Sequence, residues 1–157
     1  TIDRILETID EEGLSRNRDL SGNTGSYRWS TNAMDVIGFG HHDAYVNAIT
    51  YRALRNATAM LKDLGRKERA KQCRHAADSI HAAFAKTLIN PDTGSVAGWH
   101  SRDGQLHDYA FTWVNGPAIA FGLLDKKAGQ RAMMYLEQLR QQQGIGPPGH
   151  TIESSAY

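Results

Sequence analysis

The sequence has one cysteine, Cys73, among its 157 residues, so no disulfide can form within the chain and packing must hold the fold. No apolar run approaches the roughly 18 residues that mark a membrane-spanning helix, and no such helix is expected. Neither sign of charge is in excess, since 18 Lys and Arg oppose 17 Asp and Glu. Nucleic acids and anionic membranes attract clustered positive charge. We therefore expect neither as a partner.

The chain begins with Thr1 rather than methionine, and no basic-then-apolar signal segment follows. We therefore expect either that the start was removed or that this is a piece of a longer protein. The composition, 40% hydrophobic and 22% charged, is typical of a globular protein, and the length fits one domain. Nothing in the sequence indicates a cellular compartment.

Apolar residues recur at helical spacing in five segments. The first contains Ile2, Ile5, Leu6 and Ile9 and ends before Gly13. The others are predicted over residues 43–64, 67–86, 109–121 and 125–143.

Punctuating residues set the limits of these helices. Asp43 and Asp125 are placed to cap helix N-termini, and Gly65 stands where a helix C-terminus favours glycine. Pro117 is expected to kink its helix or to reset the start of that helix. The second and third helices, and the fourth and fifth, are then joined by tight links into two antiparallel hairpins.

Long irregular segments separate the hairpins, at 14–42, at 88–107 and after Gln143. Turn sequences at 90–94 and 103–104 predict a small β-hairpin within 88–107. Because the tight links occupy one end of the hairpins, the long segments should gather at the other end. Residues from separate hairpins can build one site there.

A pattern of small and apolar residues runs through both hairpins, over residues 43–143. The first hairpin carries Tyr51-Arg52-Ala53-Leu54, Ala57, Ala59, Leu64-Gly65, Glu68, Ala70, Ala77, Ile80 and Ala83-Phe84, followed by Asp92-Thr93-Gly94; the second carries Trp113-Val114-Asn115, Ala118-Ile119, Gly122-Leu123, Ala128, Ala132 and Leu136. In this pattern the chain resembles the six-hairpin glycosidases, whose catalytic domain is an (α/α)6 barrel, and among them the debranching-enzyme-like and rhamnosidase-like groups.

The resemblance implies an all-α fold of antiparallel helical hairpins that form part of an (α/α)6 toroid. Six hairpins close such a barrel, and this chain has two and the second half of a third, so residues 1–157 are expected to form one partial barrel domain. The implied function is hydrolysis of oligo- or polysaccharides, with no cofactor. A partial toroid exposes apolar faces, so we also expect association with the rest of the barrel or self-association.

Glycoside hydrolysis needs two carboxyl groups beside the scissile bond. Asp35 and Asp43, both near the long-loop end, are the catalytic candidates, and Glu153 is a further loop carboxylate. Each candidate has a simpler alternative, because Asp favours turns and Asp43 can serve only as a helix cap.

Substrate-binding candidates are aromatic and polar side chains near the same end. The full set is Trp29, His41, His42, Trp99, Asp108 and Trp113, of which Asp108 can also be a helix cap and Trp113 can belong to the core. Tryptophan rings offer platforms for sugars, and polar groups fix orientation. The two adjacent histidines are expected to point apart, with no further ligand at metal spacing on the same helix, so no metal site is predicted.

Two alternatives to a glycosidase stay open. One is a non-catalytic helical-repeat module that binds a protein or peptide. The other is a lyase or phosphorylase on the same fold.

Overall fold

The computed structural model describes residues 2–17 and 39–144. Its elements, in chain order, are α1 (Ile2–Leu6), β1 (His42–Asp43), α2 (Ala44–Asp63), α3 (Lys67–Leu88), β2 (Trp99–His100), β3 (Leu106–His107), α4 (Thr112–Ala120) and α5 (Lys126–Gln142). The predicted all-α fold with a small β-hairpin is confirmed. No helix within these described residues is long and apolar enough to span a membrane.

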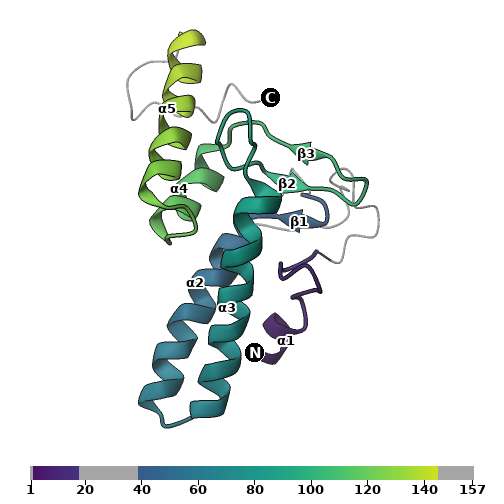
Figure 1. Cartoon of the computed structure of the whole chain (residues 1–157), viewed down its shortest axis with the longest axis vertical. Helices are drawn as coiled ribbons and strands as arrows, with labels where there is room; N and C mark the ends of the chain where they lie inside the picture. Colours follow the sequence, from purple (N-terminus) through teal and green to yellow (C-terminus); the bar gives the residue numbers. More distant parts are fainter. Residues whose placement is uncertain (1, 18–38, 145–157) are drawn as a thin grey trace.

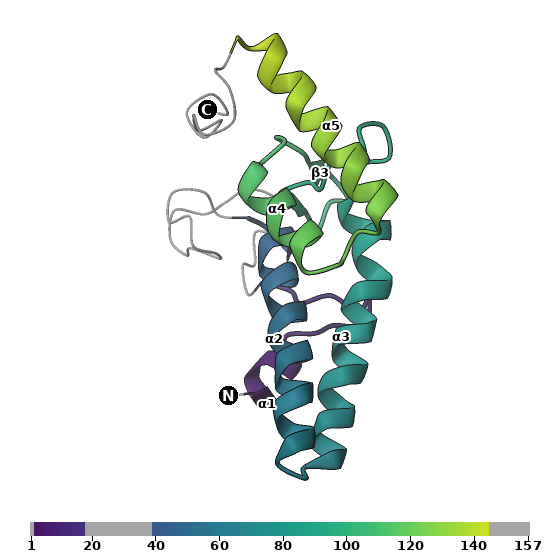
Figure 2. The same ribbon diagram turned by 90° about the vertical axis from the view of Figure 1, so that its left-hand side faces the viewer.

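Helices α2 and α3 form the long antiparallel hairpin that dominates the molecule (Figure 1). Helix α4 lies against the half of α2 nearest the sheet, and α5 returns alongside α4 (Figure 2). Both tight links, at 64–66 and 121–125, lie on the side away from the sheet (Figures 1 and 2). Of the three long segments predicted to gather at the other end, residues 39–42 and 88–107 do lie at the sheet end. Residues 18–38 and 145–157 lie outside the described part of the chain.

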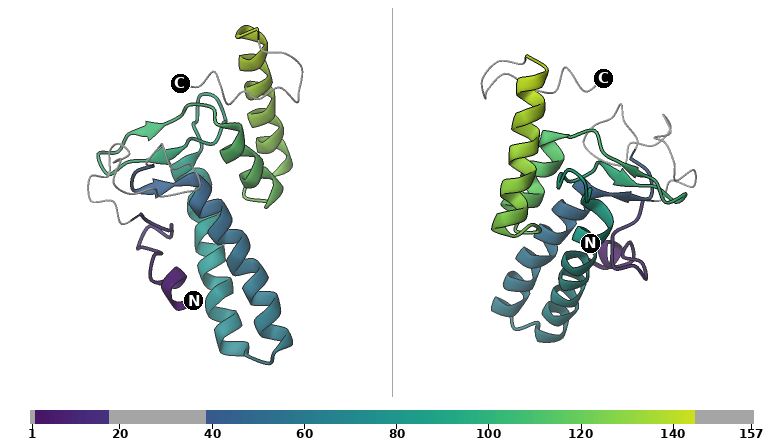
Figure 3. Two further views of the ribbon diagram at one scale, coloured as in Figure 1. Left: turned by 180° about the vertical axis from the view of Figure 1, so that it is seen from behind. Right: turned by 45° about the horizontal axis from the view of Figure 1, so that its top comes forward.

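The three short strands form one antiparallel sheet in the order β1-β2-β3 (Figure 3). His42 pairs with His100 and Asp43 with Trp99, while Trp99 also pairs with His107. The β2–β3 pair is the predicted hairpin. The sequence did not indicate β1, which joins the start of α2 to that hairpin.

The hydrophobic core runs between the α2–α3 hairpin, α4 and the loops at the sheet end. Its largest fully buried aliphatic and aromatic side chains are Phe39, Phe84, Leu14, Leu54, Ile80, Leu88, Val96 and Val114. Leu14, Phe39 and Val96 come from irregular segments. The loops therefore share the core with the helices rather than lying over it.

The predicted helix limits need two corrections. Helix α1 ends at Leu6, not near Gly13, because the Asp10 carboxylate accepts bonds from the backbone N–H groups of Glu12 and Leu14 and so favours a turn. Helix α4 begins at Thr112 rather than at Tyr109 and continues through Pro117. The caps at Asp43 and Asp125 are confirmed, because each side chain accepts from the backbone N–H three residues on.

A matching contact occurs at the start of both α2 and α4. The Asn47 side chain accepts from the backbone N–H of Ser15 (2.7 Å) and donates to the backbone carbonyl of Ser15 (2.8 Å). The Asn115 side chain does the same with Val96, at 2.8 and 3.0 Å. Ser15 and Val96 each belong to an isolated antiparallel bridge, with Ile9 and Ile89 respectively. We call these two contacts the asparagine clamps.

The clamps show that the chain contains a structural repeat. In each copy a helix is followed by a turn closed by an antiparallel bridge, and the next helix grips that turn through an asparagine in its first turn. In each copy, too, an Asx side chain at the start of the turn accepts from the backbone N–H two residues on, Asp10 from Glu12 and Asn90 from Asp92. The two copies lie at the junctions that precede the two predicted hairpins, between α1 and α2 and between α3 and α4.

Replacement of Gly94 by alanine should destabilise the protein by more than the same change at Gly65. Both glycines have positive φ, +79° and +69°, which costs an L-residue roughly 1–2 kcal/mol. A Cβ at Gly94 would also lie 2.6 Å from Cδ of Arg131, whereas one at Gly65 meets nothing within 4 Å. Arg131 cannot move freely, because it donates to the carbonyls of Pro91 and Asp92.

Urea unfolding of the two variants measures the difference. We expect Gly65→Ala to cost about 1–2 kcal/mol and Gly94→Ala to cost more. Equal losses would mean that Arg131 leaves its place without cost.

Candidate functional site

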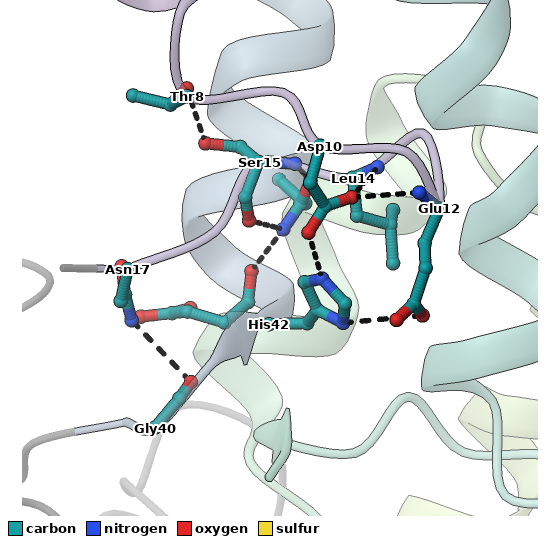
Figure 4. A network of polar contacts seen from close by, with 10 residues as sticks. Thr8, Asp10, Glu12, Leu14, Ser15, Asn17, Gly40 and His42 are labelled. Atoms are coloured by element: carbon teal, nitrogen blue, oxygen red, sulfur yellow. Dashed lines mark hydrogen bonds and ion pairs between the residues drawn. The ribbon is translucent and has the colours of Figure 1, made fainter. Parts of the chain in front are cut away.

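At the sheet end of the molecule, polar side chains from two segments that are distant in the sequence form a cluster. The Nε2 atom of His42 lies 2.8 Å from Oδ2 of Asp10, 32 residues away. The imidazole is fully buried and the Asp10 side chain is 10% exposed. On the other side of the ring, Nδ1 of His42 lies 4.0 Å from Oε2 of Glu12 (Figure 4).

The N-terminal segment is fixed beside His42 by main-chain contacts. The backbone N–H of Asn17 donates to the His41 carbonyl at 2.8 Å, and its side-chain amide donates to the Phe39 carbonyl at 2.8 Å. The clamp at Asn47 holds Ser15 from the other side. The position of Asp10 therefore follows from several bonds, not from its ion pair alone.

His41 lies next to His42, with ring centroids 4.0 Å apart. The prediction that the two rings point apart is wrong. One ligand-type atom from each of Asp10, His41 and His42 lies within 4.8 Å of the others. Burial lowers the pKa of His41, and His42 and Arg102 act in the same direction, against the opposing charges of Asp10 and Glu12.

Asp43 has the structural role that the sequence left open as its alternative. It is fully buried, and Oδ1 accepts from the backbone N–H of Val46 at 3.0 Å. A catalytic carboxylate has to reach the substrate. The location of Asp43 within the structure therefore favours capping of α2 over acid–base chemistry.

Asp108 does not cap α4, whose N-cap residue is Phe111. Its Oδ2 accepts from Ser95 (2.6 Å), Asn90 (2.9 Å) and Thr93 (3.3 Å), and its Oδ1 accepts from the backbone N–H of Ala110. Asp108 thus ties the 90–95 turn to the approach to α4. Ala110 has a φ of +57°, which this bond helps to hold.

The aromatic candidates differ in exposure. Trp99 is 5% exposed, and its ring stacks on Phe39 (4.6 Å) and on His107 (4.3 Å), so both faces are occupied. Trp113 is half-buried, and its ring lies 5.3 Å from that of Phe39. Tyr109, which the sequence reasoning did not select, is 53% exposed and lies 5.8 Å from Trp99.

A serine, a histidine and an aspartate also meet on the β2–β3 hairpin, but in the wrong order for nucleophilic catalysis. The Ser101 hydroxyl donates to Asp103 and lies 3.0 Å from Nε2 of His107. An activated serine would donate to histidine, with the aspartate behind it. Ser101 is also 1% exposed. These residues therefore stabilise the hairpin.

Asp35, Trp29 and Glu153 lie outside the described residues, and the structure does not place them. Asp10 is the residue that sequence reasoning missed. It lies in a segment predicted as helix, and no spacing rule connects it to His41 and His42. The bridge between Ile9 and Ser15, the clamp at Asn47 and the bonds of Asn17 bring it to the sheet.

No protein-family model matches the chain, and no curated protein matches it. Among solved structures, the chain is similar to the GH78 family rhamnosidase of Bacillus sp. GL1. The TM-score is 0.63 at 15% identity, and the match covers 91% of this chain and 16% of the rhamnosidase chain. The chain therefore has a distant relationship of fold to a glycosidase with an (α/α)6 barrel.

Proposed function

We propose that this chain is part of the helical-barrel domain of a glycoside hydrolase and that carbohydrate binds at the sheet end of its hairpins. The observation that carries the proposal is the fold match over 91% of the chain to a GH78 rhamnosidase. The chain spans 16% of that structure. The catalytic activity of the whole protein is thus itself part of the proposal.

The arrangement of the loops also favours the sheet end as the place where carbohydrate binds. Residues 39–41 and 89–111 meet there, and they bring together polar groups and exposed aromatic surface. The ring of Tyr109, 53% exposed beside the buried Trp99, offers an apolar surface of the kind that stacks on a sugar. Trp113, on α4, supports the Tyr109 ring through Phe111. The ring centroids of Trp113 and Phe111 are 5.3 Å apart.

The proposed chemistry is acid–base hydrolysis by two carboxyl groups. One stays protonated and assists departure of the leaving oxygen, and the other activates water or attacks the sugar. Asp35 is the proposed carboxylate within this chain, because Asp43 is committed to capping α2. The second carboxylate is not assigned.

The test is turnover of aryl glycosides and oligosaccharides by the full-length protein and its Asp35→Asn variant. Loss of general acid–base catalysis should lower kcat by about 10²- to 10⁴-fold. The control is Asp63→Asn, an exposed carboxylate at the last residue of α2, which should leave kcat unchanged.

An unchanged kcat for Asp35→Asn, with the variant folded by circular dichroism, would remove Asp35 from the mechanism. Unsaturated products would identify a lyase, and phosphate-dependent release of sugar phosphate would identify a phosphorylase. If wild-type protein leaves every glycan intact but binds a protein or peptide, the helical-repeat module is the correct alternative.

A further inference from the structure

We infer that Asp10, His41 and His42 form a binding site for a divalent transition metal of the zinc class. One ligand-type atom from each residue lies within 4.8 Å of the other two. The site joins the turn after α1 to the residues that lead into α2. The inference concerns residues other than the proposed catalytic carboxylate and does not rest on the proposed function.

The donor set selects the metal class. Two imidazole nitrogens and one carboxylate oxygen suit zinc and its neighbours in the first transition row. Calcium and magnesium favour all-oxygen sites and do not fit two histidines. Three protein ligands leave a fourth tetrahedral position for water or another donor.

The ligand atoms need only small movements to bind. Zinc lies about 2.0–2.2 Å from nitrogen and oxygen ligands, which places two tetrahedral donors about 3.4 Å apart. Nε2 of His42 and Oδ2 of Asp10 are 2.8 Å apart and would separate slightly. The remaining separations, at most 4.8 Å, would shorten by no more than about 1.4 Å. His41 is half-buried, unlike the fully buried His42, and rotation of its ring is the movement we expect.

Unpartnered nitrogen atoms are a second, independent observation. Nδ1 of His41 and Nδ1 of His42 are both buried, and neither has a hydrogen-bond partner in the described part of the chain. Buried polar atoms normally have one. A hydrogen bond between Asp10 and His42 alone would leave the His41 atom unexplained, whereas a metal ligated by His41 accounts for it.

Glu12 stands where an outer partner of a metal-bound histidine belongs. Ligating histidines usually donate their other ring N–H to a carboxylate, which fixes the tautomer. If Nε2 of His42 binds the metal, the single proton of the neutral imidazole resides on Nδ1. Oε2 of Glu12 lies 4.0 Å from this Nδ1 atom. Figure 4 shows Asp10 and Glu12 on opposite nitrogens of the same ring.

The test is a titration of the chelator-treated full chain with Zn²⁺, followed by calorimetry, and with Co²⁺, followed by its visible absorption. We expect one equivalent to bind and a tetrahedral cobalt spectrum. His41→Ala should weaken binding by more than the about 10- to 100-fold expected for loss of an outer partner, which is the expected effect of Glu12→Gln.

His41→Ala is the decisive variant because it keeps the hydrogen bond between His42 and Asp10 and therefore the fold, which circular dichroism checks. His75→Ala removes an exposed imidazole on α3 and should leave the affinity unchanged. Zn²⁺ should raise Tm of the wild type but not of His41→Ala, since a ligand of the folded state stabilises it.

The inference is overturned if the wild-type chain binds no stoichiometric Zn²⁺, or if folded His41→Ala binds it as tightly as the wild type. Neither result depends on glycoside turnover. Failure of the metal site and failure of the proposed function are therefore separate outcomes.

Discussion

Replacement of Asn115 by alanine should lower the free energy of unfolding by about 2–6 kcal/mol, because two buried main-chain groups lose their partner at about 1–3 kcal/mol each. These groups are the N–H and the carbonyl of Val96. Val96 and Asn115 are both fully buried. Water cannot replace the lost bonds without opening the structure.

Urea denaturation of the variant measures this loss. Asn56→Ala is the matched control, because Asn56 is an exposed asparagine inside α2 and should change stability by less than about 0.5 kcal/mol. Asn47→Ala should cost as much as Asn115→Ala, since it releases the same two kinds of group from Ser15. A loss below 1 kcal/mol at both sites would show that the clamps do not hold the turns.

Phe39→Ala should cost about 3–5 kcal/mol, the range for removing a fully buried phenylalanine. Phe39 is 0% exposed and lies at the centre of the aromatic cluster, 4.6 Å from Trp99 and 5.3 Å from Trp113. Its loss leaves a cavity between the sheet and α4. The near-ultraviolet circular dichroism should weaken as well, because both tryptophans lose a fixed neighbour.

The control for this change is Phe121→Ala. Phe121 is half-buried at the end of α4, where Arg52 lies over its ring, and its truncation should cost less than half as much. Unfolding in urea distinguishes the two variants. Similar losses would mean that Phe39 is not a centre of the core, and retained near-ultraviolet signal would mean that the tryptophans are held without it.

The helices were predictable because their signals are local. Asp43 caps α2 and Asp125 caps α5, as expected. Gly65 has the positive φ that a helix end favours. Each depends on residues within four positions. The same holds for the β2–β3 hairpin, which Asp103-Gly104 indicated.

The site was less predictable because its contacts are distant in sequence. Asp10 meets His42 across 32 residues, and Asn115 holds Val96 across 19. Trp99 is of a residue type that can stack on a sugar, yet it is buried because Phe39 and His107 cover the two faces of its ring. Neither exposure nor pairing of this kind follows from periodicity, since it depends on which loop packs against which.

The asparagine clamps have a consequence for how this architecture can diverge. Each amide bonds only to main-chain atoms, which every residue except proline supplies in full. Serine occupies the gripped position in one copy and valine in the other, with the same geometry. The turns can therefore exchange nearly all their side chains during evolution while two asparagines preserve their attachment.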